Sequence, residues 1–164
     1  AAVDSGDFAT ALPVWTPLAE QGNMLAQYGL GLMYYDGLGV PQDYKTAVKW
    51  YKLAAEQGYA DAQFNLGNMY AIGNGVLQNY KTAIKWYTLA AEQGFANAQS
   101  NLGFMYYNLL DYVYAHMWWN IAASTGNKDA AKNRGIVTEQ MAPSQLEKAQ
   151  DLARECVAKD YKGC

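Results

Sequence analysis

The sequence predicts an all-α fold in which helix-turn-helix repeats stack into an α-solenoid. A pentapeptide returns at residues 18–22, 54–58 and 90–94, a step of 36 residues, and a degenerate copy follows 32 residues later at 122–126. A fixed period in this range is typical of small stacked units, none of which buries its apolar face alone. The repeats therefore favour a binding scaffold over a catalytic pocket.

The best-preserved repeat, residues 54–89, shows how each unit divides into two helices. Residues 60–70 carry apolar side chains at helical spacing, and residues 73–75 interrupt this pattern with Gly-Asn-Gly. Residues 79–93 are helical again, with an apolar stripe on one side and lysines on the other. We expect the same pair of helices in the neighbouring repeats.

Capping residues recur in register with the pentapeptide. The second helix of each repeat follows a good N-cap residue and ends at a glycine suited to a left-handed C-cap. The N-cap residues are Asp7, Asp43, Asn79 and Asp111. The glycines are Gly22, Gly58, Gly94 and Gly126.

Small and large residues also recur together. Small residues stand where we expect two helix backbones to approach closely, and the tryptophans are the large halves of the same packing. The small residues are Gly31, Gly67, Gly103, Ala47, Ala83 and Ala115. The tryptophans are Trp50, Trp86 and Trp118.

These motifs resemble the Sel1-like repeat of bacterial proteins, a relative of the tetratricopeptide repeat. Its pattern begins A-x-A-Q-x-x-L-G-x-M-Y and ends A-A-E-Q-G, and it is met by residues 25–58, 60–94 and, with a shortened loop, 96–126. The resemblance implies a right-handed α-solenoid that forms a single domain. We divide it into a half repeat (1–22), three repeats (about 23–58, 59–94 and 95–126) and C-terminal capping helices (127–164).

Both ends depart from the regular pattern. The half repeat lacks a first helix. Pro13 and Pro17 should bend its remaining helix or raise the free energy needed to form it. Asn-Leu-Leu at residues 108–110 replaces the Gly-x-Gly-Val turn of the other repeats. Two less regular helices, about 127–140 and 144–159, are expected to cover the end of the array.

The resemblance implies that the first helix of each repeat lines a concave face. We predict that this face is an aromatic groove that binds an extended segment of another protein. Its residues differ between repeats, as expected where packing does not dictate identity, although any one of them could instead pack on a neighbouring helix. The predicted partner-binding residues are Tyr28, Leu32, Tyr35, Phe64, Asn65, Asn68, Asn101, Phe104 and Tyr107.

Two other functions compete with this reading. Some cysteine-rich relatives bind or hydrolyse β-lactams, but they carry a cysteine pair in each repeat and this chain has none within its repeats. Weak self-association through an open N-terminal end is the other alternative. We expect no enzyme activity, cofactor or metal site, because His116 is the only histidine and lies in a tryptophan-rich helix segment that suits a structural role.

Charge and the chain ends limit partners and location. The net charge is −3 without a Lys/Arg cluster, which argues against nucleic acid, and no apolar run approaches the length of a membrane span. The start, Ala-Ala-Val, fits either a trimmed chain or a mature protein without its signal peptide, so we expect a periplasmic or secreted bacterial protein while a cytoplasmic location stays open. Cys156 and Cys164 are expected to form a disulfide in an exported protein, the alternative being a buried Cys156 and a loose terminal thiol.

Overall fold

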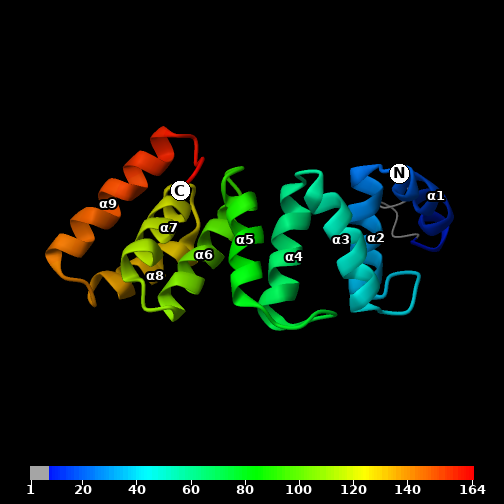
Figure 1. Ribbon diagram of the computed structural model, residues 1–164, viewed down its shortest axis with the longest axis horizontal. Helices are drawn as coiled ribbons and strands as arrows, with labels where there is room; N and C mark the ends of the chain where they lie inside the picture. Colours follow the sequence, from blue (N-terminus) through cyan, green and yellow to red (C-terminus); the bar gives the residue numbers. More distant parts are fainter. Residues whose placement is uncertain (1–7) are drawn as a thin grey trace. The chain divides into compact units, whose positions relative to one another are not determined.

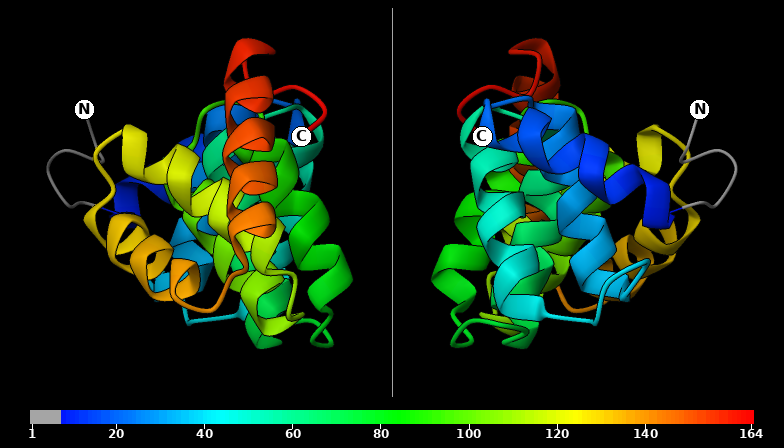
Figure 2. Two further views of the ribbon diagram at one scale, coloured as in Figure 1. Left: turned by 90° about the vertical axis from the view of Figure 1, so that its left-hand side faces the viewer. Right: turned by 90° about the vertical axis from the view of Figure 1, so that its right-hand side faces the viewer.

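The computed structural model describes residues 8–164, and these residues form helices joined by turns and short loops (Figures 1 and 2). The described helices are α1 (Phe8–Glu20), α2 (Met24–Asp36), α3 (Tyr44–Glu56), α4 (Ala60–Ile72), α5 (Tyr80–Ala91), α6 (Ala96–Asn108), α7 (Tyr112–Ser124), α8 (Lys128–Thr138) and α9 (Pro143–Ala158). The predicted all-α architecture of helix-turn-helix repeats is confirmed. None of these helices combines the length and apolarity needed to cross a membrane.

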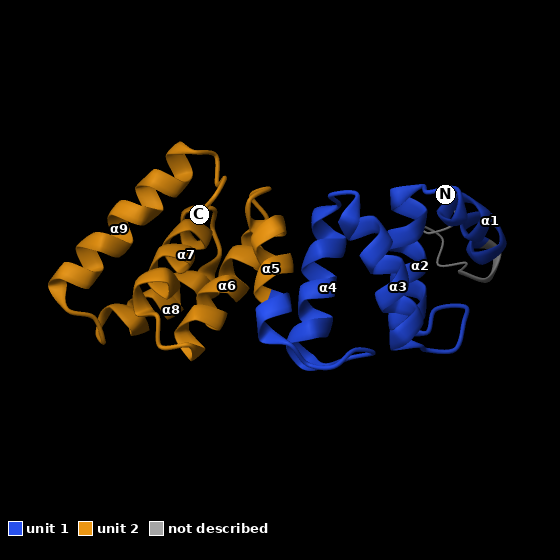
Figure 3. Cartoon of the chain, in the orientation of Figure 1, with its two compact units in different colours: residues 1–83 blue, residues 84–164 orange. Residues whose placement is uncertain are grey.

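The chain divides into two compact units, residues 1–83 and 84–164, with the boundary inside α5 (Figure 3). Each unit has its own buried apolar cluster. In unit 1 the cluster comprises Ala19, Ala26, Leu30 and Met33. In unit 2 it comprises Ala115, Trp119, Ala122, Ala130 and Val137. The organisation as a single domain stays a prediction.

The predicted N-caps are present wherever the structure describes them. The side chain of Asp43 accepts hydrogen bonds from the backbone amides of Lys45 and Thr46, and Asn79 accepts one from Thr82 at 3.0 Å. The fourth residue of this kind, Asp111, accepts one from the backbone of the third residue after it at 3.2 Å. Asp7 lies outside the described residues.

The pentapeptide ends each of four helices with the same pair of backbone hydrogen bonds. Gly58 has a φ of 94°, its amide donates to Ala55, and the amide of Tyr59 donates to Ala54. This pair of bonds is a Schellman motif, and it needs a residue that tolerates a left-handed backbone. The motif recurs at Gly22, Gly94 and Gly126, as predicted.

The glutamine of the repeat pattern adds a third bond at the same helix ends. The buried side chains of Gln27, Gln63 and Gln99 each donate to the backbone carbonyl eight residues earlier, at 3.0, 3.1 and 3.2 Å. The Oε1 atom of Gln27 also accepts a hydrogen bond from Gln57. Thr125 replaces Gln57 in the last repeat, and the Oε1 atom of Gln99 is buried without a partner in the described chain.

The close approach predicted at the repeated glycines is made by aromatic rings. A Cβ atom added at Gly31 would overlap the ring of Tyr51, and one added at Gly103 would overlap the indole of Trp119. The ring is therefore not the predicted tryptophan at positions 50 and 118 but the residue that follows it. Tyr51 is only 1% exposed, so it forms part of the core.

Helix α1 continues through both Pro13 and Pro17 and packs on α2. Proline has no amide hydrogen, so two bonds of the helical ladder are missing. The ring of Trp15 lies against Gly29, at a distance that leaves no room for a Cβ atom. Packing on α2 thus helps a helix that its own backbone bonds support poorly.

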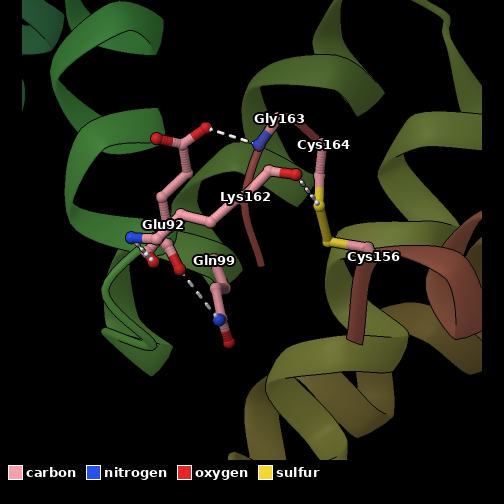
Figure 4. The surroundings of a disulfide bond; sticks show 7 residues. Glu92, Gln99, Cys156, Lys162, Gly163 and Cys164 are labelled. Atoms are coloured by element: carbon pink, nitrogen blue, oxygen red, sulfur yellow. Dashed lines mark hydrogen bonds between the residues drawn. A yellow bond between two sulfur atoms is a disulfide. The ribbon is translucent and has the colours of Figure 1, made fainter. Parts of the chain in front are cut away.

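Helices α8 and α9 both pack on α7. Helix α9 buries Ala149, Ala153 and Cys156 along one side. The predicted disulfide between Cys156 and Cys164 is present (Figure 4). Beyond α9, the tail donates two hydrogen bonds to Glu92, so unit 2 is closed by both a covalent and a polar link.

Candidate functional site

Unit 1 contains a pocket of about 130 Å³ to which α2, α3 and α4 all contribute. It is lined by Leu32, Tyr35 and Asp36 at the end of α2, by Tyr51 of α3, and by Asn65 and Asn68 of α4. Four of the predicted partner-binding residues therefore meet at this one place. We call it the unit 1 pocket.

The two tyrosines that line the unit 1 pocket, Tyr35 and Tyr51, belong to a longer row of tyrosines. The ring centroids are 5.3 Å apart between Tyr44 and Tyr35, and 6.4 Å apart between Tyr35 and Tyr51. The row continues from Tyr51 to Tyr28 at 5.9 Å and from Tyr28 to Tyr59 at 4.9 Å. Such spacings give favourable tilted and edge-to-face contacts, so the tyrosines of the row hold one another in place.

Asn65 ties this row to α4. Its side chain hydrogen-bonds to the hydroxyls of both Tyr28 and Tyr51. Burial raises the pKa of Tyr28, and the nearby carboxylates of Asp61 and Asp36 raise it further. Burial also raises the pKa of Tyr51 strongly, and Asp36 adds to this shift. The tyrosines are thus neutral hydrogen-bonding groups over a wide pH range.

Unit 2 contains a pocket of about 180 Å³ lined by Phe104 and Tyr107 of α6, Trp119 of α7, and Asn133 and Ile136 of α8. We call it the unit 2 pocket. The indole nitrogen of Trp119 donates to the Ser100 carbonyl at 3.0 Å, which fixes the ring. Phe104 is 52% exposed and Ile136 is 45% exposed, so both present apolar surface to solvent.

The two pockets occupy equivalent positions in the repeat. Two repeats after Leu32 and Tyr35, the register gives Phe104 and Tyr107. By the same step, allowing for the shortened loop, Tyr51 corresponds to Trp119. The remaining equivalent pairs are Asn65 with Asn133 and Asn68 with Ile136. One backbone arrangement therefore carries two different sets of side chains.

The remaining predicted residues have other surroundings. Tyr28 adjoins the unit 1 pocket through Tyr51 and Asn65 but does not line it. Phe64 is half-buried on α4 and lines neither pocket. Asn101 hydrogen-bonds to Tyr87, whose pKa burial raises to about 12.

Five lining residues were not predicted as binding residues. They are Asp36, Tyr51, Trp119, Asn133 and Ile136. A signal for Asn133 was present in the sequence, because it stands in register with Asn65 and Asn101. The interpretation of residues 127–140 as a less regular capping helix hides this continuing register.

Unit 2 also contains the single histidine of the sequence and a second, larger groove. His116 is 3% exposed, burial lowers its pKa, and its Nδ1 atom has no partner within residues 8–164. Within those residues no group of three or more His, Cys, Asp or Glu side chains could hold a metal ion.

A larger groove of about 390 Å³ lies between α7 and α9, outside the repeat register. It is lined mainly by small and apolar side chains such as Ile121, Ala153 and Val157.

Comparison with known proteins identifies the repeats. The Sel1 repeat family model matches residues 25–59, 60–95 and 96–127. No curated protein matches the chain. One similar structure is a protective antigen of uropathogenic Escherichia coli strains that displays an SLR fold, with 36% identity and a TM-score of 0.80. A Sel1 repeat protein from Oxalobacter formigenes is 31% identical, with a TM-score of 0.79.

These similarities extend over almost all of this chain. The match to the E. coli antigen covers 90% of this chain, but this chain spans only 33% of the antigen's length. The match to the Oxalobacter protein covers 96% of this chain and 74% of that one. With three family matches and two similar solved structures, the chain belongs to the Sel1 repeat family.

Proposed function

We propose that this chain is a non-catalytic scaffold that binds an extended segment of another protein, and that the unit 1 and unit 2 pockets each receive one side chain of a bound segment. The observation that carries the proposal is the equivalence of the two pockets. The residues that build the helices recur, whereas three of the five equivalent pairs of lining residues differ between the two pockets.

The sizes of the pockets support a side chain as the occupant. Volumes of about 130 and 180 Å³ lie below the range of roughly 300–1,000 Å³ that is common for small-molecule sites. At roughly 30 Å³ for each water, each pocket has room for a few waters or the end of one side chain. A peptide suits such pockets, because it carries single side chains at regular steps along its backbone.

The chemistry of the linings supports the same reading. Aromatic side chains bring large contact area with few rotatable bonds, and they are common among the strongest contributors to protein interfaces. Half-exposed Phe104 in unit 2 and Tyr35 in unit 1 are of this kind. The asparagines of the unit 1 pocket can accept and donate hydrogen bonds, as an extended peptide requires.

We also propose that the scaffold works in the bacterial periplasm or outside the cell. The disulfide between Cys156 and Cys164 supports this location, because such bonds persist mainly in oxidising compartments. Location and partner class are proposed for this chain alone, whatever the longer E. coli antigen does.

Selection from a display library of short random peptides tests the binding function. We expect the wild-type chain to enrich peptides that a carrier without the protein does not enrich. The double variant Phe104→Ser and Ile136→Ser removes apolar surface from the unit 2 pocket. It should weaken binding of peptides that use this pocket by about tenfold or more, the usual cost of losing a buried apolar anchor.

Leu77→Ser is the matched control, because Leu77 is 91% exposed and lines neither pocket. This variant should bind the selected peptides as the wild type does. Absence of any enriched peptide would contradict the proposed function. Leu32→Ser is the corresponding variant of the unit 1 pocket. Peptides that bind equally to the wild type, to Leu77→Ser, to the double variant and to Leu32→Ser would also contradict it.

A further inference from the structure

The unit 1 pocket contains a negative charge that the described chain does not neutralise. Asp36 is the last residue of α2, where the partial negative charge of the helix end disfavours a carboxylate. Asp36 is exposed and has no ion-pair partner among residues 8–164. The residue therefore contributes little to the stability of its own helix, and its charge is available to a bound group.

The tyrosines beside Asp36 add to the negative potential. The faces of aromatic rings carry partial negative charge and attract cations within about 6 Å of the ring centre. Tyr35 and Tyr51 both line the pocket beside Asp36. Asp61, at the start of α4, acts in the same direction, since its charge reaches Tyr28 and Tyr59.

Positive side chains are missing from the two helices that contribute most of the lining. Neither α2 nor α4 contains a lysine or an arginine. The lysines of α3, at positions 45, 49 and 52, are exposed, and none of them lines the pocket. An incoming cation would thus meet a carboxylate, aromatic rings and amides, and no like charge in the lining.

The equivalent pocket of unit 2 lacks this property. Asn108 stands where unit 1 has Asp36, and Ile136 stands where unit 1 has Asn68. The lining of the unit 2 pocket contains no charged residue. The two pockets share a backbone arrangement, so the difference in charge comes from side chains alone.

We propose that the unit 1 pocket selects a lysine or arginine side chain of the bound segment, with Asp36 as the charged contact and Tyr35 and Tyr51 as the aromatic walls. This inference rests on the proposed function, since it names the chemistry that one pocket recognises. The pocket volume of about 130 Å³ suits the end of such a side chain. An apolar side chain would cover the carboxylate of Asp36 without offering it a partner.

A pair of small probes tests the charge preference directly. Nα-acetyl-arginine amide carries the guanidinium group, and Nα-acetyl-citrulline amide has nearly the same shape without the charge. Each is titrated into the full chain while the side-chain amide signals of Asn65 and Asn68 are followed by NMR. We expect the arginine probe to bind about fivefold more tightly than the citrulline probe at low salt, a typical effect of one exposed charge with an aromatic neighbour.

The variant Asp36→Asn should remove the difference between the two probes. Glu56→Gln is its matched control, because it removes one negative charge from the end of α3 and lines no part of the pocket. The control should keep the preference for arginine, and rising salt should weaken that preference in the wild type. Unchanged thermal unfolding of both variants shows that each remains folded.

Equal binding of the two probes to wild type would overturn the inference. A preference that survives Asp36→Asn would also overturn it. These results are separate from those of the peptide selection. If the selection yields peptides without a basic residue, and the probes bind equally, the scaffold function stands and the charge preference is wrong. If no peptide is enriched but arginine is preferred through Asp36, the charge preference stands and peptide binding is wrong.

Discussion

The unit 1 and unit 2 pockets differ in chemistry although they occupy equivalent positions of the repeat. Both linings contain a tyrosine of the first helix and an asparagine at equivalent positions. Unit 1 adds a carboxylate, a second asparagine and a second tyrosine, whereas unit 2 adds a phenylalanine, a tryptophan and an isoleucine. In both units a ring of the second helix covers a glycine of the first, Tyr51 on Gly31 and Trp119 on Gly103. The comparison teaches that the contacts between helices fix the site, while the lining remains open to change.

The two units also differ in how their structure is secured. Unit 2 has the Cys156–Cys164 disulfide and a tail that bonds to Glu92, and α8 supplies one side of its pocket. The cysteines of the chain both belong to unit 2, so unit 1 has no such link. Its pocket depends on the tyrosine row and on the hydrogen bonds of Asn65. Variants that remove the disulfide of unit 2 or the tyrosine contacts of unit 1 test which interactions stabilise each unit.

The largest expected effect comes from removing the disulfide. Replacing Cys156 and Cys164 together by serine opens a short loop, and chain entropy predicts a loss of about 2–3 kcal/mol in the free energy of unfolding. Urea denaturation measures this loss, and hydrogen exchange followed by NMR shows where it falls. We expect amides of α8 and α9 to lose protection first. Equal loss of protection in α2 and α3 would contradict a link that serves unit 2.

The next effect comes from filling the space under the rings. Gly31→Ala and Gly103→Ala should each lower the free energy of unfolding by about 1–3 kcal/mol, because the added methyl group overlaps Tyr51 or Trp119. Gly135→Ala in α8 is the control, because nothing lies within 4 Å of the added atom. It should raise stability by about 0.5–1 kcal/mol through the better helix propensity of alanine. Thermal and urea unfolding of the three variants measure these changes in the free energy of unfolding.

A smaller effect is expected from the hydroxyl of Tyr51. Tyr51→Phe removes the hydrogen bond to Asn65 and should cost about 1 kcal/mol. Because burial raises the pKa of Tyr51 in the folded chain, the unfolded tyrosine ionises first as pH rises. The contribution of Tyr51 to the free energy of unfolding is therefore full below pH 10, the ordinary pKa of tyrosine, and falls above it.

The Tyr51→Phe variant should show a shallower loss of stability above pH 10 than the wild type. Asn65→Ala and the double variant complete a cycle that isolates the bond between the two side chains. The measurement is the free energy of unfolding at a series of pH values. An identical alkaline slope for wild type and Tyr51→Phe would show that this hydroxyl is not held neutral by the fold.

Much of the fold could be predicted from the sequence because its signals repeat. Asp43, Asn79 and Asp111 cap helices as predicted, and the glycines of the pentapeptide adopt the left-handed backbone that ends a helix. A single cap would be weak evidence, but the same residue types at the same spacing leave few other structures. The repeat also located most of the lining of the unit 1 pocket.

The rest could not be predicted, for identifiable reasons. Asp36 and Tyr51 come from outside the face assigned to binding, and only the tertiary structure brings them beside Asn65. Ile136 and Asn133 lie in a helix that keeps the repeat's glycine at Gly135 but lacks its leucine and tyrosine signals, so the register is hard to follow there. Helix α1 runs through two prolines because Trp15 packs on Gly29, which no local propensity indicates.

The most direct test of the account compares both pockets in one experiment. Nα-acetyl-arginine amide and Nα-acetyl-leucine amide are titrated separately into the wild-type chain. The reporters are the side-chain amides of Asn65 and Asn68 in unit 1, and the Trp119 indole and Asn133 amide in unit 2. The account predicts that arginine shifts the unit 1 signals at lower concentration and leucine shifts the unit 2 signals at lower concentration. The same order of preference at both pockets would contradict it.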